Sequence, residues 1–187
     1  MNTLILGGAR SGKSALAEGL ALASGLEVVV IATAALRHDD AEMTARIAHH
    51  RDRRPAAWAT VEEPLALGEA IRREAMSGRL VLVDCLTVWL ANLLFDGRDH
   101  AETGIVALPA RLNAEREALL AALAEVQGDV VLVANEVGLG IVPLGAINRA
   151  FVDEAGRLNQ AVAAVCDNAV FVAAGLPLML KGTLPAR

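Results

Sequence analysis

The chain has no tyrosine, and aromatic residues make up only 3% of its 187 residues. Because hydrophobic residues still make up 55%, the core must be built from Leu, Val, Ile and Ala. Such aliphatic runs are typical of α/β proteins with buried parallel strands. The two cysteines, Cys85 and Cys166, lack a metal-type spacing, which argues against a disulfide framework and a zinc site and indicates buried thiols in a reducing compartment.

A long hydrophobic run is also missing. The most apolar stretch, residues 80–95, is interrupted by Asp84 and Asn92 and is shorter than the roughly 18 residues of a membrane span. The first residues enter a predicted strand with no signal peptide, and the formal net charge of −5 argues against a general nucleic-acid surface. With no linker or repeat, we expect a cytoplasmic protein folded as one domain over residues 1–187.

What is present is a phosphate-binding motif near the N-terminus. It reads G-x-x-x-x-G-K-S, and its eight residues are Gly7, Gly8, Ala9, Arg10, Ser11, Gly12, Lys13 and Ser14. A short apolar run precedes it and a helix-prone stretch follows, which is the strand, turn and helix that the motif requires. The alternative is a glycine-rich turn with a chance lysine, which a complete motif in the right context makes the weaker interpretation.

The residue types of this motif explain its chemistry. Its three glycines permit backbone angles and close approach that a side chain would block. The loop amides can then converge on a phosphate at a helix N-terminus, where an anion is favoured. Lys13 can reach the β- and γ-phosphates of ATP or GTP, and the Ser14 hydroxyl can bind Mg²⁺. Lys13 is one of only two lysines in the chain.

Apolar runs elsewhere predict an α/β fold, with a mostly parallel sheet, helices on both faces and an antiparallel C-terminal edge strand. The predicted strands after the motif are residues 27–33, 57–62, 80–84, 130–134, 169–174 and 175–181. The predicted helices are residues 38–54, 65–76, 86–94, 109–126 and 144–166, and residues 97–104 are expected to form a loop. Ligands of such sheets bind at the carboxyl ends of the strands, so residues 33–35 should lie beside the phosphate loop.

Asp84 ends the run Leu80-Val81-Leu82-Val83, a pattern typical of a Walker B strand. An aspartate there helps to hold Mg²⁺ in P-loop enzymes. The alternative is a strand that merely ends in an acid. Given the phosphate loop in the same chain, we favour the metal role.

Two adjacent histidines lie in the predicted helix at residues 38–54. At 100° per residue, His50 falls on the apolar stripe with Met43 and Ile47, whereas His49 points well away from it. His50 is therefore the packing histidine and His49 the exposed, reactive candidate. The alternative is a solvated helix with two incidental histidines, and composition does not decide between these interpretations.

Several segments together resemble the bifunctional adenosylcobinamide kinase/adenosylcobinamide-phosphate guanylyltransferases of cobalamin biosynthesis. The matching segments are the phosphate loop and residues 31–33, 40–55, 135–143 and 155–160. They cover nearly the whole chain in collinear order. The last three are far more specific than the phosphate loop, which many families share.

The resemblance implies two reactions. ATP or GTP phosphorylates the hydroxyl of the aminopropanol arm of adenosylcobinamide, and GMP from GTP is then transferred to that phosphate, giving adenosylcobinamide-GDP and pyrophosphate. The family transfers GMP through a histidine, which corresponds to His49. The resemblance also implies a RecA-like P-loop fold and a homotrimer.

Around the nucleotide the resemblance places Thr33, Ala34, Arg51, Arg53, Arg54 and Glu62. We add as candidate nucleotide-binding residues their neighbours Ala35, His50 and Asp52 and the strand-end Asp84. The arginines could pair with phosphates through forked hydrogen bonds, and Glu62 could accept hydrogen bonds from the guanine edge. Arg53 and Arg54 make this chain more basic here than some relatives, and Asp84 is compatible with the family without being diagnostic of it.

Two other interpretations of the function remain open. In an ordinary small-molecule P-loop kinase, Arg51 or Arg54 would serve as lid groups and His49 would have no chemical role. In a GTPase-type switch we would expect an N-K-x-D signature, but Asn135 is followed by Glu136, and no D-x-x-G begins at Asp84. The sequence therefore favours the kinase over the switch.

Overall fold

The computed structural model describes residues 1–34, 54–95 and 106–183. The strands in these ranges are β1 (Asn2–Gly7), β2 (Glu27–Ala32), β3 (Ala59–Glu62), β4 (Arg79–Asp84), β5 (Asp129–Asn135), β6 (Asn168–Ala173) and β7 (Leu176–Lys181). The helices are α1 (Lys13–Ala23), α3 (Leu67–Glu74), α4 (Leu86–Leu94), α5 (Ala110–Glu125) and α6 (Ala146–Val165). The predicted helix at 38–54 and the predicted loop at 97–104 lie almost wholly outside these ranges.

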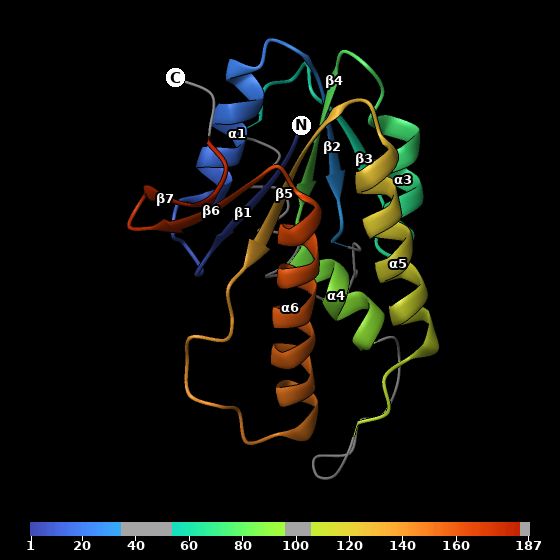
Figure 1. Ribbon diagram of the computed structural model, residues 1–187, viewed down its shortest axis with the longest axis vertical. Helices are drawn as coiled ribbons and strands as arrows, with labels where there is room; N and C mark the ends of the chain where they lie inside the picture. The colour runs from blue at the N-terminus through green and yellow to red at the C-terminus, as the bar shows by residue number, and fades with distance from the viewer. Residues whose placement is uncertain (35–53, 96–105, 184–187) are drawn as a thin grey trace.

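The strands form one sheet in the order β3-β2-β4-β5-β1-β6-β7 (Figure 1). All neighbouring strands are parallel except β6 and β7, which are antiparallel. The predicted parallel sheet with an antiparallel C-terminal edge strand is confirmed. Since the six parallel strands end at the same edge, the phosphate loop and the ends of β2, β4 and β5 are brought together there.

Alternate residues of each central strand enter two separate cores. Leu4 of β1 faces one core and its neighbour Ile5 faces the other, as the period of two in a strand requires. Helix α1 covers the smaller core, whereas α3, α4, α5 and α6 cover the larger one (Figure 1). The result is a three-layer α/β structure whose core is almost entirely aliphatic.

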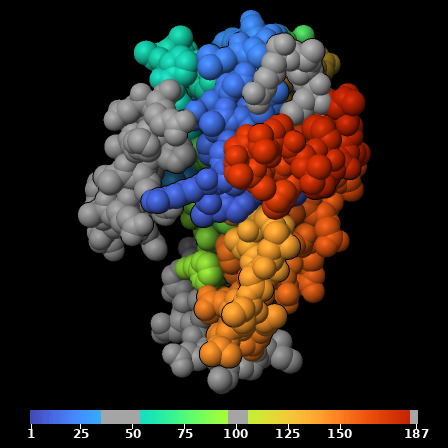
Figure 2. Space-filling view, turned by 90° about the vertical axis from the view of Figure 1, so that its left-hand side faces the viewer, coloured from blue at the N-terminus to red at the C-terminus, as the bar shows by residue number. Residues whose placement is uncertain are grey.

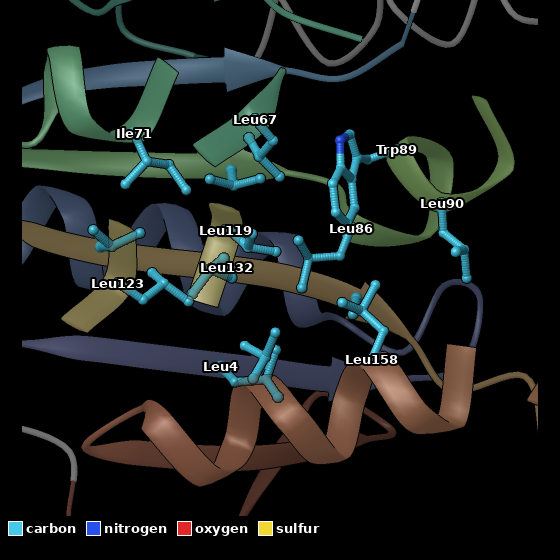
Figure 3. Packing of buried hydrophobic residues seen from close by; sticks show 14 of the residues in the cluster. Leu4, Leu67, Ile71, Leu86, Trp89, Leu90, Leu119, Leu123, Leu132 and Leu158 are labelled. Carbon is cyan, nitrogen blue, oxygen red and sulfur yellow. The ribbon is translucent and has the colours of Figure 1, made fainter. Parts of the chain in front are cut away.

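Leucines from the sheet and from four helices fill the larger core (Figure 3). Trp89 of α4 is fully buried among them, and its indole Nε1 donates a hydrogen bond to the Leu65 carbonyl at 2.8 Å. Helices α3 and α5 approach closely at Gly68, where a Cβ atom would lie 2.6 Å from the backbone carbonyl of Ala118. Any other residue at this position would push these two helices apart.

Within the described residues the predicted elements are correct in type, and their ends differ by at most two residues. Helices α3, α5 and α6 are each shorter at both ends than the predicted 65–76, 109–126 and 144–166. None of the three has a side-chain hydrogen bond at its N-cap, so nothing in the sequence marks the first residue. Strand β3 likewise begins at Ala59, two residues later than predicted.

Among the helices in the described ranges, none has both the length and the hydropathy needed to cross a membrane.

Candidate nucleotide-binding site

The phosphate loop connects β1 to α1 at the carboxyl edge of the sheet. Gly12 has φ +99°, in the left-handed region that glycine tolerates, and α1 begins at the next residue. The turn between β6 and β7 braces the loop, because the Gly175 amide donates a hydrogen bond to the Ser11 carbonyl at 2.8 Å. The loop therefore opens onto the N-terminus of α1, where a phosphate is favoured.

Lys13 lies inside this loop with only 9% of its surface exposed. Its ammonium donates to the Gly8 carbonyl at 3.1 Å. Burial lowers the pKa of Lys13, and the neighbouring Cys85 and Asp84 oppose part of that effect. A cation held out of water in this way would gain from a bound phosphate.

Asp84 and Arg54 meet at the same edge of the sheet. An Arg54 guanidinium nitrogen lies 2.6 Å from an Asp84 carboxylate oxygen, and the two side chains are 8% and 18% exposed. The Arg54 Nε is buried without a hydrogen-bond partner within the described residues. The arginine can therefore donate a further hydrogen bond to a ligand while it keeps its contact with Asp84.

Thr33 holds the ends of β2 and β4 together. Its buried hydroxyl donates to the Cys85 carbonyl at 2.7 Å and accepts from the Cys85 amide at 3.0 Å. Asn92 of α4 donates in turn to the Thr33 carbonyl at 2.7 Å. The backbone of Cys85 thus uses the hydrogen-bonding capacity of the Thr33 hydroxyl, so this residue shapes the site. No sequence pattern identified Cys85 and Asn92 as its partners.

The other described candidates lie around this edge. Ser14 is partly exposed in the first turn of α1, and Ala34 follows Thr33 with partial exposure. Glu62 is the last residue of β3, paired in register with Ala32, and is exposed. The remaining candidates lie in the segment 35–53, outside the described residues: Ala35, His49, His50, Arg51, Asp52 and Arg53.

Sequence reasoning marked the loop after β5 as functional without giving it a chemistry. Asn135 ends β5 in register with Gly7, and the Glu136 amide donates to the Gly7 carbonyl at 3.1 Å. The backbone amide of Asn135 donates a hydrogen bond to the Thr87 hydroxyl of α4 at 2.7 Å. Thr87 was missed, because a lone threonine in a helix carries no sequence signal.

An open hollow lies beyond this strand end, between the loop and α6. It is lined by Val137, Gly138, Gly140, Ile141, Val142, Pro143, Arg149, Val152 and Asp153. Exposed apolar side chains stand along its loop, with Ile141 98% and Leu144 96% exposed. An apolar surface of this kind, beside a phosphate loop, suits a second and larger ligand.

The residues present fit a magnesium ion that accompanies a nucleotide. No group of three or more His, Cys, Asp or Glu side chains in the described ranges could hold a metal by itself. Magnesium in nucleotide sites instead takes one or two protein ligands and completes its shell with phosphates and water. By residue type, the Ser14 hydroxyl and the Asp84 carboxylate could provide such a pair, and Asp84 lies close enough to Lys13 to raise its pKa.

Comparison with known proteins finds relatives that match nearly the whole chain. The family model described as cobinamide kinase / cobinamide phosphate guanyltransferase matches residues 3–180. The chain is 57% identical to the bifunctional adenosylcobalamin biosynthesis protein CobP of Pseudomonas aeruginosa, over 97% of this chain and 98% of that protein. It is 42% identical to the bifunctional adenosylcobalamin biosynthesis protein CobU of Escherichia coli, over 97% of this chain and 100% of that protein.

A solved structure of an ATPase from the type III secretion system of pathogenic bacteria is also similar. It aligns with a TM-score of 0.54 and 13% identity over 95% of this chain and 56% of that chain, a likeness that concerns the fold alone. The sheet order and the phosphate loop agree with a P-loop NTPase fold. With a family match over nearly its whole length, the chain belongs to the cobinamide kinase / cobinamide phosphate guanyltransferase family of enzymes.

Proposed function

We propose that this enzyme first phosphorylates adenosylcobinamide with ATP or GTP and then transfers GMP from GTP to the resulting phosphate. The products of the second reaction are adenosylcobinamide-GDP and pyrophosphate. The observation that carries the proposal is the meeting of Lys13, Asp84 and Arg54 at the phosphate-loop edge, in a chain matched to the family over residues 3–180.

Nucleotide phosphates would bind to the loop amides, with Lys13 turning from the Gly8 carbonyl to a phosphate oxygen. Ser14 and Asp84 would hold Mg²⁺, which neutralises phosphate charge when bound. Phosphoryl and nucleotidyl transfer depend mainly on positioning and charge stabilisation, and a buried lysine serves both.

His49 is the proposed carrier of GMP. Its imidazole nitrogen would attack the α-phosphorus of GTP, and the bond to pyrophosphate would break. The phosphate oxygen of the acceptor would then displace the histidine, which splits one hard transfer into two easier ones. Support comes from Arg54, the first described residue after the segment 35–53, which contacts Asp84 at the phosphate-loop edge.

The family resemblance and the strand ends also suggest which other residues surround the nucleotide. We assign to it Thr33, Ala34, Ala35, His50, Arg51, Asp52, Arg53, Arg54, Glu62 and Asp84. The arginines supply forked donors for phosphates, and Glu62, exposed at the end of β3, supplies an acceptor for the guanine edge.

A corrinoid-free experiment tests the histidine step. The protein is mixed with Mg²⁺ and GTP labelled at the α-phosphate and then separated on a denaturing gel, beside His49→Ala and the matched control His50→Ala. We expect an acid-labile, base-stable labelled band that only His49→Ala loses. An unlabelled wild-type protein that nevertheless binds GTP would contradict the guanylyl-histidine and favour a plain kinase.

We also propose that the enzyme assembles as a homotrimer, as the family resemblance implies. The edge strand β7 supports an assembly, because Leu176, Leu178 and Leu180 are 72%, 61% and 57% exposed at alternating positions. The hairpin of β6 and β7 lies at the molecular surface, in red (Figure 2). An apolar row on an edge strand is normally covered by another chain or protected from pairing.

A further inference from the structure

The side chain of Asn135 is held at the phosphate-loop edge without a partner of its own. Its Oδ1 atom is buried and accepts no hydrogen bond from any described residue. Its backbone is fixed on both sides, by the pairing with Gly7 of β1 and by the 2.7 Å hydrogen bond to Thr87. The position of this amide is therefore set by the fold, and its hydrogen-bonding capacity is left open.

An unpaired buried carbonyl oxygen is costly. The penalty is about 1–3 kcal/mol, because water is lost and nothing replaces it. The preceding residues of β5, from Val130 to Ala134, are all apolar and buried, so packing alone would favour one more apolar side chain at this position. Such an orphaned polar group calls for a partner, and at the phosphate-loop edge a bound ligand can supply it.

The chemistry of the amide limits that partner. Oδ1 can only accept a hydrogen bond, and so can the oxygens of an ionised triphosphate. A hydrogen-bonding partner of Oδ1 must therefore carry a hydrogen, and the hydroxyl that receives the phosphoryl group is such a donor. The Asn135 Nδ2 can donate to a phosphoryl oxygen at the same time, because the amide presents both functions side by side.

The place of Asn135 in the sheet fits this role. Its strand lies between β1, which leads into the phosphate loop, and β4, which ends in Asp84 (Figure 1). The hollow after β5 begins two residues further on, at Val137. Asn135 thus stands between the proposed site of the terminal phosphate and the surface suited to a large organic acceptor.

We propose that Asn135 is a catalytic residue of the kinase reaction, whose amide holds the acceptor hydroxyl against the terminal phosphoryl group. The hydroxyl oxygen forms a bond to the γ-phosphorus, and the bond to the nucleoside diphosphate oxygen breaks with its electron pair on that oxygen. The proton of the hydroxyl passes to water, while Asn135 orients the group and takes no proton. This inference rests on the proposed binding of nucleotide at the phosphate loop.

The two reactions of the enzyme should depend differently on this amide. The acceptor in guanylyl transfer is a phosphate, which offers no alcohol hydrogen to Oδ1. Substitution of Asn135 should therefore impair phosphorylation and spare guanylyl transfer. A merely structural residue would affect both reactions together.

The test compares wild type with Asn135→Leu, which has a similar size and removes the amide. Phosphorylation of adenosylcobinamide, guanylyl transfer to preformed adenosylcobinamide phosphate, binding of a fluorescent GTP analogue and urea unfolding are each measured. We expect the kinase kcat to fall about 100-fold or more, as for a lost transition-state hydrogen bond. Guanylyl transfer and nucleotide binding should stay within about threefold, and the protein should unfold at no lower urea concentration.

Two further variants keep the experiment decisive. Asn113→Leu makes the same change at an exposed position of α5 and should alter neither reaction. If Asn135→Leu does not fold, Asn135→Ser replaces it, and its smaller hydroxyl should also lower the kinase kcat selectively. Equal loss of both reactions, or an unchanged kinase rate, would overturn the role of Asn135. A wild-type protein that binds nucleotide but phosphorylates no corrinoid would overturn the proposed function and this inference with it.

Discussion

The contact between Arg54 and Asp84 is a short and largely buried charge interaction at the candidate site. The two groups are 2.6 Å apart and mostly buried, beside the largely buried ammonium of Lys13. In such surroundings a charge is costly unless it is paired. The charges of Arg54, Asp84 and Lys13 are therefore energetically coupled, so substitution of one should change the energetic contribution of the others.

Removal of the arginine should destabilise the protein even without nucleotide. We expect Arg54→Ala to lower the free energy of unfolding by about 1–3 kcal/mol, because it leaves the Asp84 carboxylate with less compensation. Urea unfolding of Arg54→Ala, Asp84→Ala and the double variant measures the coupling. Strictly additive losses would contradict a direct energetic link between these side chains.

The thiols of Cys85 and Cys166, unlike the side chains of Arg54, Asp84 and Lys13, carry no charge at physiological pH. Burial raises the pKa of Cys85, which Asp84 raises further, and burial raises the pKa of Cys166 to about 12. Both cysteines are free, and both therefore remain neutral thiols at physiological pH. The expectation of ordinary buried thiols is confirmed for Cys166, whereas Cys85 is partly exposed at the candidate site.

At the scale of elements, Lys181 joins the edge strand β7 to the end of α6. Its ammonium donates hydrogen bonds to the carbonyls of Ala163, Ala164 and Cys166. These carbonyls lie in the last turn of α6 and at its C-cap, Cys166, where backbone acceptors are unpaired and the helix dipole favours a cation. The second of the two lysines is thus as specifically placed as Lys13.

We expect Lys181→Met to lower the free energy of unfolding by about 1–2 kcal/mol, because the helix end loses its cap and its favourable charge. Urea unfolding measures the change. The matched control is Arg73→Met, where an exposed arginine pairs only with the adjacent Glu74 among described residues and should contribute less than about 0.5 kcal/mol. Equal effects in the two variants would show that Lys181 contributes only its surface charge.

At the scale of the whole molecule, two exposed apolar regions stand out. One is the row of leucines on β7, and the other is the loop at residues 139–144 beside the hollow. We relate the loop to the corrinoid and the strand to assembly, because a ligand needs a hollow and a partner chain can cover an extended edge.

Sedimentation velocity tests the assembly. We expect the wild-type protein to sediment as a trimer and Leu178→Lys to shift it toward monomer, because a charge would be buried in the contact. Leu22→Lys, at a 59% exposed position of α1, is the matched control and should remain trimeric. A monomeric wild type would contradict the trimer, and a trimeric Leu178→Lys would exclude β7 from its contact.

The order of the elements and the type of fold could be predicted from the sequence. Aliphatic runs such as those of β4 and β5 can be satisfied only by strands buried on both faces, and the phosphate-loop motif defines its own strand, turn and helix. For the same reason Lys13 and Asp84 could be assigned to one edge before any coordinates. Local composition and periodicity decide these features, and both are properties of the chain alone.

Only the tertiary structure decided which distant side chains meet. The contacts of Arg54 with Asp84, of Thr33 with Cys85, and of Asn135 with Thr87 each join residues 30 or more positions apart. No local pattern specifies such pairs, since they depend on how neighbouring strands align in the sheet. Burial, too, is set by the packing of all layers, and so the altered pKa of Lys13 and the orphaned oxygen of Asn135 could be found only in the folded chain.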